Sequence, residues 1–129
     1  MIGVGVDAVD IERFRRSLAR TPGMRERLFT KAELDYVEPK VDPVPSLAAR
    51  FAAREAVMKA LGLGLGAFGF HEVWVEVESS GAPRLVVTGR AAELAAERGV
   101  TSWHLSLSHD GDAAVAMVVA EAGSVPSQP

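Results

Sequence analysis

The sequence has 129 residues, 48% hydrophobic and 24% charged, a composition typical of one globular domain with a sizeable core. Fourteen basic and seventeen acidic residues give a formal net charge of −3, which argues against a general nucleic-acid binder. The absence of cysteine excludes disulfides, thiol nucleophiles and Cys-ligated zinc. No apolar run approaches the roughly 20 residues that cross a bilayer, and no signal-peptide pattern opens the chain, so we expect a cytoplasmic protein.

Hydrophobic periodicity and turn residues divide the chain into helices and strands. Asp10 is placed to cap the first helix, and Ser46 is the expected N-cap of the longest one. Thr30 and Glu33 have the spacing of a capping box that opens a short helix. The expected elements are a strand over 2–6, helices over 9–18, from 31 onward and over about 47–61, strands over 72–78 and 84–88, a helix over 91–98, and strands over 103–109 and 113–120.

This order of elements predicts an α+β fold with a mainly antiparallel sheet. We expect a single domain over residues 1–121. The tail over residues 122–129 is small, polar and Pro-rich, so we expect it to be disordered.

Asp7 and Glu55 are carboxylates at positions where a packed protein favours apolar side chains. Asp7 ends the first strand, and Glu55 lies inside the helix over about 47–61. A buried carboxylate is costly unless it is paired, hydrogen-bonded or bound to a metal. Mg²⁺ is usually held by one or two carboxylates plus substrate phosphates, so the pair suggests a site that handles phosphate through a divalent ion. The structural alternative is that Asp7 caps a helix and Glu55 pairs with Lys59 or Arg50.

Two further features could contact phosphate. The glycines of the loop over residues 62–66 follow a helix, so they form neither a dinucleotide fingerprint nor a Walker A loop. They could cradle phosphate with backbone N–H groups, or they could simply end the helix. His109 ends a strand and points to the opposite face from Ser108, which excludes a hydrolase triad in this segment. His109 could contact a ligand phosphate or have a structural role.

Arginines are concentrated between residues 13 and 27, and this segment has a local excess of positive charge. Arg13, Arg16 and Arg20 fall on one face of the predicted first helix. That face could be a solvated surface or a docking surface for an acidic protein partner. An RNA contact is a third possibility, with little aromatic interleaving to support it.

Three stretches of the sequence, in order, resemble one family. They are Gly3-Val4-Gly5-Val6-Asp7 followed by Glu12-Arg13-Phe14, then Arg50-Phe51-Ala52-Ala53-Arg54-Glu55-Ala56 with Lys59-Ala60-Leu61-Gly62, then Ser106-Leu107-Ser108-His109-Asp110. From residue 2 to about 121 the chain resembles holo-[acyl-carrier-protein] synthase, the short, trimeric type of 4′-phosphopantetheinyl transferase. The resemblance implies the fold of that family, a mainly antiparallel sheet packed against a long central helix. It also implies a homotrimer with active sites in the clefts between subunits.

The resemblance implies transfer of the 4′-phosphopantetheine group from coenzyme A to a serine of apo acyl carrier protein, releasing adenosine 3′,5′-bisphosphate, as part of fatty acid biosynthesis. It implies Mg²⁺ held by Asp7 and Glu55. The implied catalytic residues are Asp7, Glu55, Lys59 and His109; the implied coenzyme A contacts are Arg50, Arg54, Lys59, Gly62, Gly64, Pro83 and His109; the implied carrier-protein contacts are Arg13, Arg16 and Arg20.

One residue departs from the family pattern. The family usually has lysine before the motif glutamate, whereas this chain has Arg54, which binds phosphate well but cannot shed a proton. Asp7, Glu55 and His109 are all candidates for the general base. Two rival hypotheses are a non-catalytic regulatory module that binds coenzyme A or a nucleotide, and a small RNA- or protein-binding domain that uses the arginine face.

Overall fold

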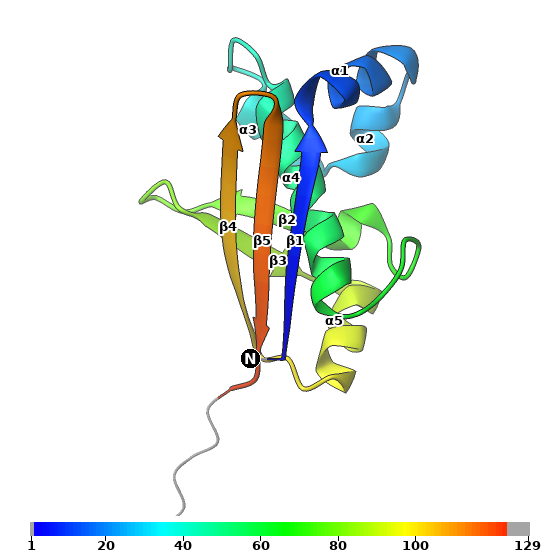
Figure 1. Cartoon of the computed structure of the whole chain (residues 1–129), viewed down its shortest axis with the longest axis vertical. Coiled ribbons are helices and arrows are strands. Elements are labelled where there is room, and N and C mark those ends of the chain that lie inside the picture. Colours follow the sequence, from blue (N-terminus) through cyan, green and yellow to red (C-terminus); the bar gives the residue numbers. More distant parts are fainter. Residues whose placement is uncertain (1, 124–129) are drawn as a thin grey trace, which may run out of the picture.

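The structure is a computed structural model that describes residues 2–123. Over these residues the strands form an antiparallel three-stranded sheet in the order β1-β5-β4 and a separate two-stranded hairpin, β2-β3. Figure 1 shows the long helix α4 behind the three-stranded sheet, with the hairpin extending past β4. The elements are β1 (Gly3–Asp10), α1 (Ile11–Arg20), α2 (Met24–Leu28), α3 (Lys31–Val37), α4 (Val44–Ala60), the 3₁₀ turn η1 (Phe70–Glu72), β2 (Val73–Val77), β3 (Pro83–Val87), α5 (Gly89–Glu97), β4 (Ser102–Asp110) and β5 (Ala113–Glu121).

The architecture confirms the predicted α+β class, the antiparallel pairing and the long central helix. Asp10 caps α1 as predicted, because its Oδ1 accepts the N–H of Arg13 at 2.8 Å. The capping box of Thr30 and Glu33 is also present at the start of α3. The predicted tail lies, from residue 124 onward, outside the described residues, so its disorder stays a prediction.

Two details of the helices differ from the prediction. Ser46 is not the N-cap of α4, which already begins at Val44, where the carboxylate of Asp42 accepts the Val44 N–H at 3.2 Å. Pro45 fits the first turn because the N–H groups of a first turn have no partner within the helix. The helix α2 was not predicted, since its five residues are too few to show a period.

Strand β1 lies directly on the backbone of α4 because two of its inward-facing residues are glycines. A Cβ atom at Gly5 would lie 1.8 Å from the carbonyl oxygen of Ala56, and one at Gly3 would lie 1.9 Å from that of Ala60. No larger side chain could fit at this spacing. Asp7 is the next inward-facing residue of the strand, so the two glycines bring its carboxylate close to α4.

The two faces of the three-stranded sheet differ in exposure, but on β1 and β5 both faces carry apolar side chains. Toward α4, β5 presents small buried side chains such as Ala116 and Val118. On the opposite face Val4, Val6 and Met117 are 43%, 50% and 45% exposed. Val6 pairs with Met117 across the β1–β5 ladder, so these side chains form a continuous apolar surface. Within residues 2–123, no helix is long and apolar enough to cross a membrane.

Candidate active site

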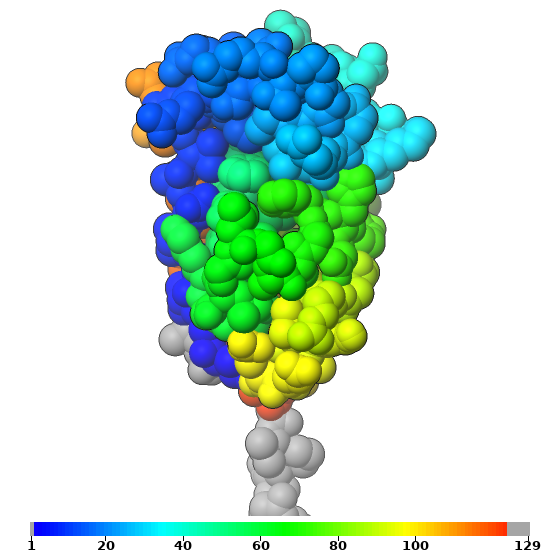
Figure 2. Space-filling model, turned by 90° about the vertical axis from the view of Figure 1, so that its right-hand side faces the viewer, coloured from blue at the N-terminus to red at the C-terminus, as the bar shows by residue number. Residues whose placement is uncertain are grey.

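A pocket of about 400 Å³ opens between β1, α1 and α4, and two carboxylates stand on its wall. Asp7 reaches it from β1 and Glu55 from the middle of α4. Figure 2 shows this side of the molecule, where α1 and α2 lie above β1 and the last turns of α4. The remaining lining residues are Ala8, Val9, Asp10, Arg13, Phe14, Ser17, Met24 and Phe51.

The two carboxylates interact electrostatically. Partial burial and, second, the negative charge of Asp7 raise the pKa of Glu55 above its ordinary value, while Lys59 lowers it. Desolvation and a like charge both disfavour the ionised form of a carboxyl group. The pocket wall therefore carries two acidic groups whose joint ionisation is unfavourable unless a cation lies near them.

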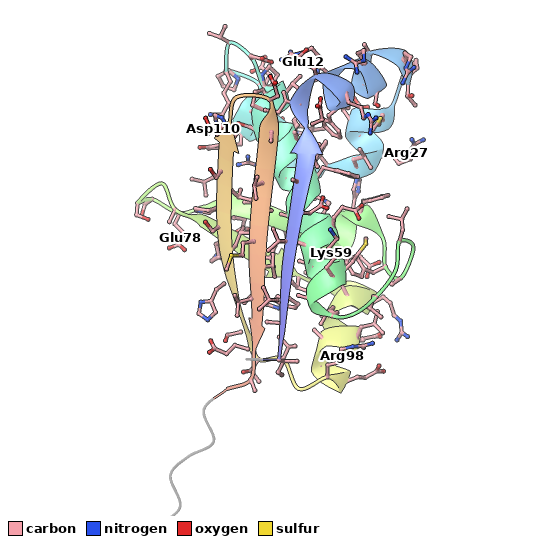
Figure 3. All side chains as sticks on the ribbon, in the orientation of Figure 1. Glu12, Arg27, Lys59, Glu78, Arg98 and Asp110 are labelled. Atoms are coloured by element: carbon pink, nitrogen blue, oxygen red, sulfur yellow. The ribbon has the colours of Figure 1, made fainter. Side chains whose placement is uncertain are left out.

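Lys59 supplies one such cation, from the turn of α4 that follows Glu55. Its ammonium donates to Oδ1 of Asp7 at 2.9 Å and to the carbonyl oxygen of Val6 at 3.0 Å. Figure 3 shows Lys59 on the side of α4 that lies next to β1. Among the described residues Glu55 has no ion pair, so the structural alternative in which it pairs with Lys59 or Arg50 is wrong.

The donor set of this pocket fits Mg²⁺. Asp7 and Glu55 present oxygen donors from two elements whose relative position is set by packed backbones. Within residues 2–123, no group of three or more His, Cys, Asp or Glu side chains is placed to hold a metal. Mg²⁺ is commonly bound by two carboxylates, while water and substrate phosphate occupy its other coordination positions.

Arg54 does not line the pocket, which corrects its assignment as a phosphate ligand. Its side chain is fully buried, and its guanidinium donates to both carboxylate oxygens of Glu33. Its Nε donates to the carbonyl oxygen of Phe70 at 2.8 Å. A guanidinium that is excluded from solvent and already bonded on each nitrogen has no donor left at the surface for coenzyme A. Arg54 is a structural residue of the helix that carries Glu55.

Arg50 also points away from the two carboxylates. It is 5% exposed, lies 5.2 Å from the ring centroid of Tyr36, and donates from Nη1 to the carbonyl oxygen of Ser46. Its buried Nε has no hydrogen-bond partner among the described residues. Burial therefore lowers the pKa of Arg50 from its ordinary value. Arg50 therefore lies beside Tyr36 in the interior and is not among the residues that line the pocket.

The remaining predicted coenzyme A contacts divide into two groups. Gly62 and Gly64 are exposed in the loop that follows α4, shortly after Lys59 in the sequence. His109 is exposed at the end of β4, two strands away from β1. From the register, its Cα lies about 12 Å from that of Asp7. Pro83 begins β3, which packs on the β4 side of the molecule. Within one chain, His109 and Pro83 therefore do not lie next to the carboxylates of Asp7 and Glu55.

The three predicted docking arginines are exposed on α1. Arg13 also lines the pocket, so the basic surface of α1 extends to the pocket that holds the two carboxylates. Arg15 lies between them in sequence but is held by Asp42, to which both of its terminal nitrogens donate. The basic surface is therefore made by Arg13, Arg16 and Arg20.

The sequence prediction missed the apolar part of the pocket. Phe14 and Phe51 were assigned to helix faces without a role in a site, yet their rings stack 5.4 Å apart and line it. Met24 comes from the unpredicted α2. Phe14 and Phe51 both lie inside the family motifs, and this was the sequence signal for the apolar part of the pocket.

Comparison with known proteins identifies the family. A sequence profile described as ACPS, 4′-phosphopantetheinyl transferase superfamily, matches residues 3–118. The chain belongs to this superfamily. It is 57% identical over 122 residues to the holo-[acyl-carrier-protein] synthase of Streptomyces avermitilis, a match that covers 94% of this chain and 98% of that protein. Both results confirm the family resemblance of the three motifs.

Solved structures of the superfamily share the fold. The crystal structure of the holo-[acyl-carrier-protein] synthase from Neisseria meningitidis superposes with a TM-score of 0.84 at 34% identity, covering 94% of this chain and 99% of that one. The Helicobacter pylori holo-[acyl-carrier-protein] synthase, solved in complex with coenzyme A, has a TM-score of 0.77 at 27% identity, covering 92% of this chain and 99% of that one. The phosphopantetheinyl transferase fold predicted from the motifs is therefore confirmed.

Proposed function

We propose that this chain transfers the 4′-phosphopantetheine group from coenzyme A to a serine of apo acyl carrier protein. The observation that carries the proposal is the convergence of Asp7, Glu55 and Lys59 beside a pocket bordered by a basic helix. The 57% identity to a holo-[acyl-carrier-protein] synthase over nearly the whole chain supports the same reaction.

The reaction is a displacement at phosphorus. The serine oxygen forms a bond to the phosphorus that carries the pantetheine arm, the pyrophosphate P–O bond breaks, and adenosine 3′,5′-bisphosphate leaves with the bridging oxygen. The serine proton passes to a general base, for which Asp7, Glu55 and His109 are the candidates. Such a displacement depends mainly on positioning and charge neutralisation, which the cation of Lys59 supplies from the pocket rim.

Asp7 and Glu55 are the residues that hold Mg²⁺ in this proposal. When bound, Mg²⁺ neutralises phosphate charge and stabilises the leaving phosphate. The raised pKa of Glu55 supports the assignment, because burial and the charge of Asp7 disfavour its ionised form and a bound cation would favour it. Gly62 and Gly64, in the exposed loop that follows α4, are proposed to bind the phosphates through their backbone.

A homotrimer explains why the predicted contacts divide into two groups. The apolar outer face around Val6 and Met117 suits burial against a second copy of the chain. In such an assembly Pro83 and His109 of one subunit are proposed to complete the pocket of its neighbour, which they do not reach within one chain. Closed assembly also covers the sheet edges β1 and β4.

The acidic carrier protein is proposed to dock on Arg13, Arg16 and Arg20. These side chains are exposed and lie beside the pocket opening, so a partner seated on α1 could place its serine near Asp7. Complementary charge of this kind mainly raises the rate of encounter. Service to fatty acid biosynthesis and a cytoplasmic location stay predictions.

Intact-protein mass spectrometry of an apo acyl carrier protein tests the reaction directly. Incubation with this chain, coenzyme A and Mg²⁺ should add the mass of one phosphopantetheine, and EDTA should abolish the gain. Glu55→Gln should lose most of this activity, whereas Glu93→Gln, an exposed glutamate of α5, should keep it. No mass gain with several apo carriers that another transferase can load would leave a non-catalytic binding module as the better hypothesis.

A further inference from the structure

Lys59 and a divalent cation are both drawn to the carboxylate of Asp7. The ammonium of Lys59 lies 2.9 Å from Oδ1 of Asp7, one of the two oxygens that this carboxylate offers to the proposed Mg²⁺. We infer that Lys59 competes with the metal for Asp7, and that coenzyme A relieves this competition by drawing Lys59 onto its phosphates. The inference rests on the proposed function and adds an internal regulator of metal binding to it.

The geometry sets the two cations in competition for the charge of one carboxylate. Mg²⁺ binds carboxylate oxygens at about 2.1 Å. A metal on Oδ1 would therefore face the ammonium across one oxygen atom, where two positive charges repel strongly. The same ammonium is held by the carbonyl oxygen of Val6, which fixes it on the β1 side of the carboxylate. Release of Asp7 by Lys59 therefore removes a repulsion and favours metal binding.

Lys59 is able to move. Its side chain is 54% exposed, whereas that of Asp7 is 17% exposed and belongs to β1, which is packed on α4. The flexible stem of a lysine lets its ammonium exchange one anionic partner for another. Phosphate groups of coenzyme A next to the pocket are such a partner. The competition therefore makes the metal and coenzyme A raise each other's affinity, as thermodynamic linkage requires.

Equilibrium binding of Mn²⁺, measured from the electron paramagnetic resonance signal of the free ion, tests this without turnover. We expect Lys59→Gln to bind Mn²⁺ alone more tightly than the wild type, by about threefold or more. Lys59→Arg keeps a cation on Asp7 and should stay within about twofold of the wild type. Coenzyme A should raise Mn²⁺ affinity in the wild type, and by a smaller factor in Lys59→Gln.

The matched control is Lys31→Gln. Lys31 forms an exposed ion pair with Asp35 on α3, so this variant loses the same charge from a lysine–aspartate pair outside the pocket. Its Mn²⁺ affinity should equal that of the wild type. An equal gain in Lys31→Gln would show a net-charge effect and overturn the inference. Unchanged or weaker Mn²⁺ binding by Lys59→Gln would overturn it as well.

The experiment separates this inference from the proposed function. The comparison with Mn²⁺ alone needs neither coenzyme A nor carrier protein, so it remains decisive if the transfer reaction is absent. Transfer activity together with equal Mn²⁺ affinity of Lys59→Gln and wild type would keep the function and reject the competition. Failure of every variant to bind Mn²⁺ would reject the metal assignment of Asp7 and Glu55, and the competition with it.

Discussion

The guanidinium of Arg54 and the carboxylate of Glu33 form a bidentate ion pair in which both side chains are fully buried. The same carboxylate accepts the N–H groups of Thr30 and Val75, each at 3.0 Å, so a single side chain joins α3, α4 and β2. The residue after Arg54 is Glu55, which points to the pocket instead. The ion pair therefore holds in place the helix that presents the catalytic candidates.

Arg54→Met should strongly destabilise the protein. It leaves the carboxylate of Glu33 buried without its cation, a change that typically costs about 3–5 kcal/mol. The free energy of unfolding in urea measures this. Arg84→Met is the control, since its ion pair with Glu76 is largely exposed and should contribute less than about 1 kcal/mol. Similar losses in the two variants would contradict the structural role of Arg54.

Gly5→Ala should lower stability because the new methyl group meets the backbone of α4. The nearest atom, the carbonyl oxygen of Ala56, leaves no room for it, and overpacking of this kind costs about 1–3 kcal/mol. Gly64→Ala provides the comparison, as no heavy atom lies within 4 Å of the added Cβ. Urea unfolding should separate the two variants clearly, and equal stabilities would show that β1 can move off the helix.

Glu55 should make stability depend on pH. Because its pKa is raised, the folded state keeps this proton to higher pH than the unfolded chain, and the stability falls as pH rises from the ordinary glutamate pKa through the raised value. In EDTA, Glu55→Gln should therefore exceed the wild type in free energy of unfolding at about pH 7 but not below about pH 4. Adding Mg²⁺ should stabilise only the wild type. A variant that is less stable at neutral pH would contradict this account.

Charge reversal on α1 should weaken recognition of the carrier protein. Arg13→Glu and Arg20→Glu should each lower kcat/KM for apo carrier protein severalfold, mainly through a higher KM, and the effect should shrink at high salt. Arg90→Glu on α5 changes the net charge equally and should have little effect. Equal losses in all three variants would indicate general electrostatics and not a docking surface.

Met117→Glu should prevent assembly of the proposed homotrimer. Met117 lies on the exposed apolar face of the sheet, which the proposed trimer would bury. A charge introduced there would be buried in the interface, which is costly. Light scattering coupled to size-exclusion chromatography should give a trimer mass for the wild type and a lower mass for the variant. Val41→Glu is the control, because Val41 is fully exposed outside the sheet. A monomeric wild type at micromolar concentration would contradict the trimer.

Local sequence patterns were sufficient to predict those features that depend on residues close together in the sequence. The cap at Asp10, the capping box at Thr30 and the alternation of β4 were predicted from the sequence and are present in the structure. The start of α4 was predicted three residues late, because the helix begins at Val44, whose N–H is bonded by Asp42, and Ser46 is not its N-cap. Helix caps and strand faces depend on spacings of a few residues, which explains why the two caps and the alternation of β4 were predicted correctly.

The sequence by itself determined the α+β class, the family motifs, and the candidacy of Asp7, Glu55 and Lys59. Only the tertiary structure decided which partners these motif side chains have. Arg54 was expected to bind phosphate but lies buried against Glu33, 21 residues away in sequence, and Lys59 pairs with Asp7 across 52 residues. The physical reason is that an ion pair depends on distance in space and on burial, which packing of β1, α3 and α4 creates and no local pattern encodes.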